Sequence, residues 1–344
     1  MAEIKKLEKN NTYLKVLWSD GEESKFNYLW LRDNCPTAHD KDSNHRMFNI
    51  LNVSKEINPK NYNINKEGKL EIEWSEGNHT SYFDLNWLRE NCYTIKNKKK
   101  YISPYKLWDS SLKDEFKSIC VEHDEIMESA DGLIKWLELL HHTGIAIVKN
   151  APIKEKSGFT VLNRISHTRE TFFKTPFEVI NIPKPNNSAY TAHALRNHMD
   201  LPWFENPPGY QFLHCLANDA IGGESLFADG FAMAEDLRAE DPKAFDLLSE
   251  VSIPFRFHDS TADIRIHRPV ITLCSKGEVI EIQYNAHLAG IFDMPVDVMP
   301  DYYQAYRSYM NKTRDSKYHL KIKLKAGEMV VFDNRRILHG RESF

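Results

Sequence analysis

Apolar and polar residues alternate in two stretches near the start of the chain, LKVLW at 14–18 and LEIEW at 70–74. A period of two puts every second side chain on one face, so each stretch is predicted to be a β-strand with one buried face. Each continues through a glycine, Gly21 or Gly77, into a further strand and a short helical WLR segment. Because 18–35 and 74–92 are near-repeats, we predict a small β-rich N-terminal domain, residues 1–100, with two related hairpins.

The pattern changes after the charge run KNKKK at 96–100, which we interpret as a solvated linker. Helices are predicted near 130–142, from Asp241 onward, and near 300–314. The strand candidates are GIAIVKN, VSIPFRF, PVITLC, EVIEIQY, HLKIKLK and EMVVFD. Short strands spaced by turns, with most helices before them, indicate an α+β protein whose second domain, 101–344, is a jelly roll with flanking helices.

Composition narrows the class of protein. A net charge of −4 over 344 residues gives no basic face for nucleic acid. No apolar run is long enough for a membrane span and no signal peptide precedes the first strand, so we expect no membrane association and a cytoplasmic location. The five cysteines are odd in number and widely spaced, which favours reduced thiols.

Candidate metal ligands stand in two His-x-acid tripeptides, His123 to Glu125 and His198 to Asp200, about as many as composition gives by chance. The first lies in an acidic stretch typical of a solvated helix. The second has two side chains that would share a face of an extended backbone. With a distant second histidine, this pair would form the facial triad of non-haem Fe(II) oxygenases, which leaves coordination positions open. We expect that histidine to be His339, on an exposed turn after the buried strand FDN.

Context decides between the two tripeptides. The segments HMD, NPPGYQFLHCLANDAIGGESLFADGF and FDNRRILHGR, in this order, resemble the Fe(II)- and 2-oxoglutarate-dependent dioxygenases of the taurine-dioxygenase superfamily. The paired WLRDNC-type N-terminal segments are similar to those of the γ-butyrobetaine and trimethyllysine dioxygenase branch. The resemblance covers about residues 12–344 and implies a double-stranded β-helix core.

The resemblance also implies site residues and cosubstrates. His198, Asp200 and His339 match the Fe(II) ligands, and 2-oxoglutarate and O2 are the implied cosubstrates. Leu213 matches a residue that contacts 2-oxoglutarate. Ser225 matches the hydroxyl that binds its distal carboxylate, although a turn-stabilising hydroxyl after two glycines is the alternative reading.

The implied substrate is a small trimethylammonium zwitterion, with γ-butyrobetaine as the first candidate. A quaternary ammonium has no N–H group, so aromatic faces must recognise it by cation–π attraction. Phe173, Phe177 and Tyr190 match the family's aromatic cage, with ordinary core packing as the alternative. Asn187 and Asn285 match amides that hold the far polar end of the substrate.

Two positions leave other substrates open. Leu201 and Ala217 stand where γ-butyrobetaine enzymes carry polar contacts to the substrate carboxylate. Trimethyllysine or a trimethylaminophosphonate is therefore an alternative substrate, and a catalytically silent binding protein is an alternative function.

Three further expectations follow from the resemblance. Relatives are commonly homodimers. Many also hold zinc through a cysteine cluster, but here Cys35 is followed by Thr37 and Asp40, so zinc is not expected. In the family an arginine about a dozen residues after the last histidine pairs with 2-oxoglutarate, followed by a strand and a dimer-forming tail. We expect the given chain to lack these segments.

Overall fold

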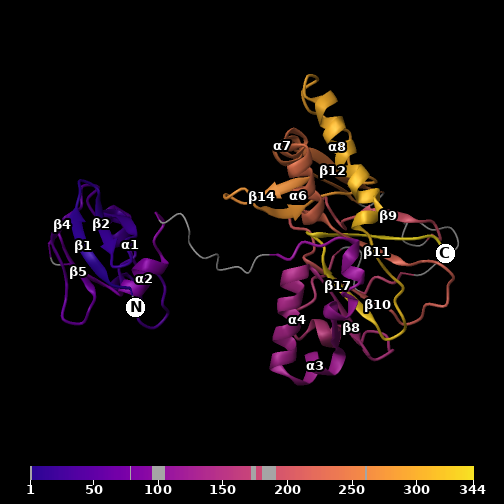
Figure 1. Ribbon diagram of the computed structural model, residues 1–344, viewed down its shortest axis with the longest axis horizontal. Coiled ribbons are helices and arrows are strands. Elements are labelled where there is room, and N and C mark those ends of the chain that lie inside the picture. Colours follow the sequence, from indigo (N-terminus) through magenta and orange to yellow (C-terminus); the bar gives the residue numbers. More distant parts are fainter. Residues whose placement is uncertain (1, 78, 95–104, 172–175, 180–190, 260–261) are drawn as a thin grey trace. The chain divides into compact units, whose positions relative to one another are not determined.

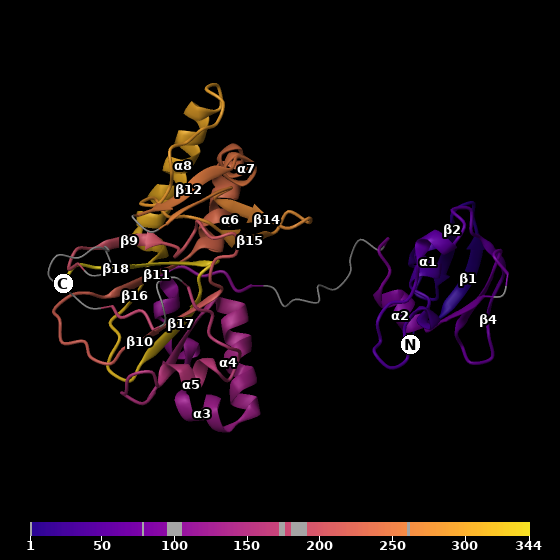
Figure 2. The same cartoon turned by 180° about the vertical axis from the view of Figure 1, so that it is seen from behind.

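The computed structural model describes residues 2–77, 79–94, 105–171, 176–179, 191–259 and 262–344 (Figures 1 and 2). The chain divides into two compact units, Met1–Ile102 and Ser103–Phe344, and each is described by itself. None of the helices described has the length and apolar character needed to cross a membrane.

The first unit repeats one arrangement twice. Each copy is a three-stranded antiparallel sheet followed by a short helix. The predicted hairpins are therefore extended by an additional strand in each copy. The elements are β1 (Ile4–Lys9), β2 (Tyr13–Trp18), β3 (Glu23–Asn27) and α1 (Tyr28–Asp33), and then β4 (Pro59–Ile64), β5 (Leu70–Trp74), β6 (Thr80–Phe83) and α2 (Leu85–Glu90).

The two copies also bury the same polar contact. The indole of Trp18 is buried and its Nε1 donates to Ser24 Oγ at 2.7 Å. The indole of Trp74 is buried in the same way, and its Nε1 donates to Ser81 Oγ at 2.8 Å. A buried donor without a partner is costly, so the serine of each repeat allows its tryptophan to enter the core.

Two four-stranded sheets form the centre of the second unit. One has the order β10-β17-β8-β7 and the other β16-β11-β18-β9; all pairs are antiparallel except β7 with β8. Their bounds are β10 (Tyr210–His214), β17 (Met329–Asp333), β8 (Ile145–Lys149), β7 (Cys120–Glu122), β16 (Leu320–Ile322), β11 (Ser225–Asp229), β18 (Ile337–Arg341) and β9 (Leu195–His198).

Helices and two hairpins complete this unit. The helices are α3 (His123–Glu128), α4 (Ala130–Thr143), α5 (Gly158–Leu162), α6 (Gly230–Glu240), α7 (Pro242–Glu250) and α8 (Met299–Arg314). The hairpins pair β12 (Ile253–His258) with β13 (Asp263–Arg268), and β14 (Ile271–Leu273) with β15 (Val279–Ile282). The predicted helices near 130–142, from Asp241 and near 300–314 are confirmed as α4, α7 and α8.

Alternating side chains of β8 and β17 separate two hydrophobic layers. Ala146 and Val148 pack with α3 and α4 on one face of the sheet. Ile145 and Ile147 pack with residues of the second sheet on the other. This is the pleat of a strand buried on both faces, which explains the uninterrupted apolar run IAIV. In both views α3 and α4 lie on one side of the sheets and α6 to α8 on the other (Figures 1 and 2).

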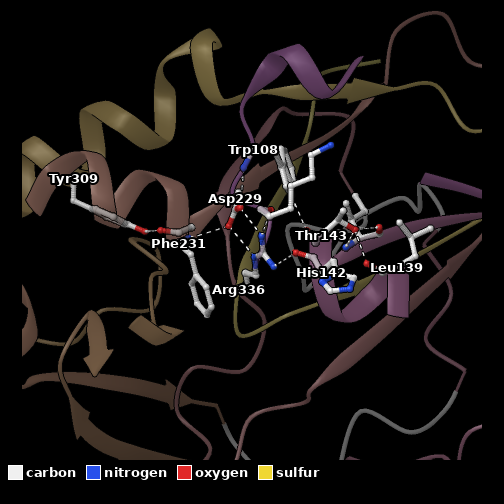
Figure 3. A network of polar contacts seen from close by, with 11 residues as sticks. Trp108, Leu139, His142, Thr143, Asp229, Phe231, Tyr309 and Arg336 are labelled. Carbon is white, nitrogen blue, oxygen red and sulfur yellow. Dashed lines mark hydrogen bonds and ion pairs between the residues drawn. The ribbon is translucent and has the colours of Figure 1, made fainter. Parts of the chain in front are cut away.

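A buried ion pair joins the end of β11 to the start of β18 (Figure 3). Arg336 and Asp229 have side chains with exposed fractions of 1% and 0%, and the guanidinium meets the carboxylate through Nε at 3.0 Å and Nη2 at 2.7 Å. Arg336 also donates to the carbonyls of His142 and Lys106, both at 2.8 Å. The amides of Trp108 and Phe231 donate to the carboxylate. We call this set of contacts the Arg336–Asp229 network.

Candidate metal centre

Strand pairing brings the two predicted histidine ligands together. His198 is the last residue of β9, and it lies opposite His339 of β18 in the antiparallel register. Their ring centroids are 4.5 Å apart. The expectation of His339 on an exposed turn is wrong: the turn ends at Arg336, and His339 lies within a strand with its side chain 14% exposed.

Asp200 completes the group from the loop after β9. Its Oδ1 lies 3.5 Å from His198 Nε2, and its Oδ2 lies 3.6 Å from His339 Nε2. One ligand atom from each residue falls within a set of atoms no more than 4.8 Å apart. This is the one such cluster of three found in the part of the chain that the structure describes.

The hydrogen bonds around the group suit a metal. His198 Nδ1 lies 2.8 Å from the Arg196 carbonyl, so Nδ1 carries the proton and the Nε2 lone pair is left for a metal. Asp200 Oδ2 accepts from Gln211 Nε2 at 2.8 Å. His339 Nδ1 is buried and has no hydrogen-bond partner among the described residues. Two imidazole nitrogens and one carboxylate, with the Asp200 side chain 41% exposed, are the donor set of a facial triad with open positions.

Opposing effects set the protonation of the three groups. Burial raises the pKa of Asp200, but the nearby imidazoles of His339 and His198 and the hydrogen bond from Gln211 outweigh burial and lower the pKa. Burial lowers the pKa of His198, but Asp200 outweighs it and the net pKa is raised. Burial and the neighbouring His198 lower the pKa of His339 to about 4. The group therefore presents an ionised carboxylate and a neutral His339 at neutral pH, as metal binding requires.

The cosubstrate candidates lie on the strands that carry the triad. Leu213 is on β10, two residues from Gln211, so both side chains project to the same face. Ser225 begins β11, two residues from Phe227, which lies opposite His339 in the register. Leu213 therefore lies on the same face of its strand as Gln211, and Ser225 lies on the face that carries His339. The contact of Leu213 and Ser225 with 2-oxoglutarate stays a prediction.

Three of the five predicted substrate-binding residues lie outside the residues that the structure describes. Phe173, Asn187 and Tyr190 lie outside the described residues, and Phe177 is exposed. Asn285 is buried, its Nδ2 donates to the Met199 carbonyl at 3.0 Å, and its Oδ1 accepts from His287 N at 3.1 Å. The amide of Asn285 is therefore used within the protein, beside the ligand tripeptide. Its role toward a substrate stays a prediction.

Sequence reasoning missed two residues that touch Asp200. Gln211 holds its carboxylate, and Asn334 Oδ1 accepts from its backbone amide at 2.8 Å. The signal for Gln211 was its spacing of two from Leu213. The signal for Asn334 was a polar residue directly after the buried strand MVVFD.

The described residues of the N-terminal unit form no comparable group of metal ligands. Cys35 is fully buried, and its Sγ lies 3.1 Å from Thr37 Oγ1. Within the described ranges, no cluster of three potential ligands includes Cys35, His39 or His45.

Comparisons with known proteins agree with this geometry. Residues 113–344 match the family model "Taurine catabolism dioxygenase TauD, TfdA family", and residues 5–89 match "Gamma-butyrobetaine hydroxylase-like, N-terminal". Gamma-butyrobetaine dioxygenase of Pseudomonas sp. (strain AK-1) is 38% identical over 96% of this chain and 86% of its own length. Mouse mitochondrial trimethyllysine dioxygenase is 32% identical over 94% of this chain and 78% of its own length.

A solved structure supports the fold. A Burkholderia xenovorans protein assigned to the alpha-ketoglutarate-dependent taurine dioxygenases matches with a TM-score of 0.50 at 13% identity, over 69% of this chain and 84% of that one. The family model and the Pseudomonas relative confirm the resemblance found in the sequence, together with the enzyme class of 2-oxoglutarate-dependent dioxygenases. The chain belongs to the taurine catabolism dioxygenase TauD, TfdA family.

Proposed function

We propose that the protein is an Fe(II)- and 2-oxoglutarate-dependent dioxygenase that hydroxylates a small trimethylammonium zwitterion, with γ-butyrobetaine as the first candidate. The observation that carries the proposal is the convergence of His198, Asp200 and His339 in a chain 38% identical to a gamma-butyrobetaine dioxygenase. The three residues would hold iron through the two Nε2 atoms and the carboxylate.

Iron bound at such a triad would supply the activation of O2 that couples decarboxylation of 2-oxoglutarate to hydroxylation of the substrate. The residues of the chain supply the geometry. The Arg196 carbonyl fixes the ring and tautomer of His198, and Gln211 fixes one carboxylate oxygen of Asp200. The Phe332 ring, 4.9 Å from the His339 ring between centroids, lines one side of this histidine.

The cosubstrate would extend along β11. Ser225 is placed on the same face as Phe227, the partner of His339, so a hydroxyl lies along the strand from the metal. It would donate to the distal carboxylate of 2-oxoglutarate, with Leu213 against the carbon chain. We also propose that the two four-stranded sheets are the two halves of a double-stranded β-helix, as the family resemblance implies.

The substrate's ammonium head would be recognised by aromatic faces. Each cation–π contact contributes about 0.5–2 kcal/mol, depending on how far it is desolvated. Phe173, Phe177 and Tyr190 are the candidates, and Asn187 and Asn285 are the candidates for the polar end. A cytoplasmic location, expected from the hydropathy of the sequence, and a homodimer, expected from the family resemblance, also remain predictions.

A second candidate substrate is trimethyllysine. The mouse relative named for it is 32% identical over 94% of this chain. Leu201 and Ala217 favour an anionic end different from that of γ-butyrobetaine, which also keeps an aminophosphonate among the alternatives.

The test is succinate formation from 2-oxoglutarate, with Fe(II) and O2, across a panel of trimethylammonium compounds. The panel holds γ-butyrobetaine, trimethyllysine, a trimethylaminophosphonate, and, as the matched control, a tert-butyl analogue of γ-butyrobetaine that keeps the carboxylate but lacks the positive charge. Stimulation by γ-butyrobetaine and not by its tert-butyl analogue supports the proposal. Stimulation by trimethyllysine alone transfers it to the second candidate. If binding to the panel occurs without any iron-dependent turnover, the protein is a silent binding protein.

A further inference from the structure

Asn334 lies in the turn between β17 and β18 and is fully buried. Its side chain reaches across 134 residues of sequence to Asp200. Oδ1 accepts from the Asp200 amide at 2.8 Å, and Nδ2 donates to the Asp200 carbonyl at 3.0 Å. The second proton of Nδ2 is directed to the Pro208 carbonyl at 3.1 Å. One amide therefore satisfies both backbone groups of a predicted iron ligand.

The hydrogen bonds of Asn334 hold the backbone of Asp200 at a point where the pairing of β9 with β18 has ended. β9 ends at His198, so the pairing with β18 that fixes His198 does not extend to Asp200. Directly after Asp200 the chain turns, since Leu201 has φ +56°, a conformation that a residue with a branched side chain adopts at a steric cost. Something must hold the chain in this turn, and the amide of Asn334 is bonded on both sides of Asp200.

Met199, the residue before Asp200, is held by hydrogen bonds to other residues. Met199 N donates to the Tyr284 carbonyl at 2.8 Å, and the Met199 carbonyl accepts from Asn285. These contacts stop one residue short of Asp200. The backbone amide of Asn334 donates to the Gly209 carbonyl at 2.7 Å, which ties the same turn to the far end of the loop after Asp200.

The position of Asn334 also connects Asp200 with His339. Its turn leads directly into β18, which carries His339. A displacement of this turn would therefore move Asp200 and His339 together, whereas loss of the side chain would release Asp200 alone.

We propose that Asn334 is a positioning residue, which acts through the backbone of Asp200 to aim its carboxylate at the metal shared with His198 and His339. The inference rests on the proposed iron-dependent function. Residues outside the ligand set that orient ligands typically change metal affinity about 10–100-fold when they are replaced.

The experiment measures Mn(II) affinity by electron paramagnetic resonance, together with kcat and KM for 2-oxoglutarate, in wild type and variants. Asn334→Ala removes all three side-chain hydrogen bonds and should weaken Mn(II) binding about 10–100-fold. Asn334→Asp keeps the acceptor for the Asp200 amide but places a buried carboxylate oxygen against two carbonyls, so its Mn(II) affinity should fall as well. Asn334→Asp is also the variant to be measured if Asn334→Ala does not fold.

The matched control is Asn197→Ala. Asn197 is 3% exposed, lies on β9 beside His198, and donates to the Thr313 carbonyl at 3.3 Å without a contact to Asp200. It should lose stability while its Mn(II) affinity stays close to that of wild type. Equal Mn(II) affinities for wild type and both Asn334 variants would overturn the inference and leave a structural role. If wild type itself binds no Mn(II), the proposed function fails instead.

Discussion

Two places in the second unit bring ionisable side chains together, and they differ in how completely these side chains are paired with other groups of the protein. In the Arg336–Asp229 network the carboxylate accepts two guanidinium contacts and two backbone amides, and the guanidinium also meets two carbonyls (Figure 3). At the metal centre, His198, Asp200 and His339 point their ligand atoms at one another across 3.5–3.6 Å, too far for good hydrogen bonds.

The difference separates a structural role from a functional one. A saturated buried ion pair has no capacity left for a ligand, so its effect is on stability and on the meeting of β11 and β18. A convergent group with unfilled ligand atoms leaves capacity for a cation at a cost to the protein without it. Mutations in the Arg336–Asp229 network should therefore change stability, whereas mutations at the metal centre should change activity.

The largest expected effect is on activity at the metal centre. Asp200→Ala removes the one anionic ligand, so succinate formation should fall to the background without enzyme. The free energy of unfolding of the metal-free protein should change little, because the Asp200 side chain is 41% exposed. Parallel turnover assays and urea denaturation test both parts. Retained turnover would contradict the assignment of the ligand.

The next effect is on stability at the network. Arg336→Met leaves Asp229 buried without its cation and should lower the free energy of unfolding by about 3–5 kcal/mol. Urea denaturation measures the loss. The double variant Arg336→Met with Asp229→Leu should recover much of it, because no unpaired charge remains. A single variant as stable as wild type would mean that the network does not differ from a surface ion pair.

A smaller effect is expected at Gln211, which touches the carboxylate but not the metal. Gln211→Leu removes one donor to Asp200, so the pKa of that carboxyl should rise and Mn(II) affinity should fall about 10–100-fold. Mn(II) titrations at neutral pH test this, and a Mn(II) affinity equal to that of wild type would assign Gln211 a packing role.

The smallest effect is an acid-side change in stability. Burial of Glu328 raises its pKa. The hydrogen bond and charge of Lys149 and the backbone amide of Lys325 outweigh burial, so the pKa of Glu328 lies below its usual value. A lowered folded-state pKa gives stability that is present above the unfolded value of about 4.3 and is lost as the pH falls through the folded value. Glu328→Gln should therefore lose under about 1 kcal/mol at pH 6 and show a flatter decline in acid. Parallel stability curves for the two proteins would contradict this.

Sequence reasoning reached the elements with strong periodicity. The alternation in LKVLW and LEIEW predicted β2 and β5, and the caps around Asp241 predicted α7. It also selected His198, Asp200 and His339, through motif order and resemblance and not through spacing, since His123 to Glu125 has the same spacing on a helix. The additional strands β1 and β4 were missed because IKKLEK and PKNYNI are mostly polar and have few buried positions.

Contacts between distant segments could not be predicted in this way. Asn334 meets Asp200, and Arg336 meets Asp229, only because β17, β18 and β11 come together in the folded unit. His339 was expected on an exposed turn after the strand FDN, yet it lies with Gly340 in β18. A Cβ at Gly340 would lie 2.6 Å from the Leu195 carbonyl, so the glycine allows close approach of strands and does not mark a turn.

The role of the triad is tested by titrating metal-free protein with Fe(II) while succinate formation from 2-oxoglutarate is measured with γ-butyrobetaine and O2 present. The variant His198→Ala is titrated in parallel. Succinate formation by wild type is expected to rise with Fe(II) and to saturate at one equivalent, while the variant stays at background. Turnover by wild type without Fe(II), or equal turnover by the variant, would contradict the claim that this triad is the catalytic metal centre.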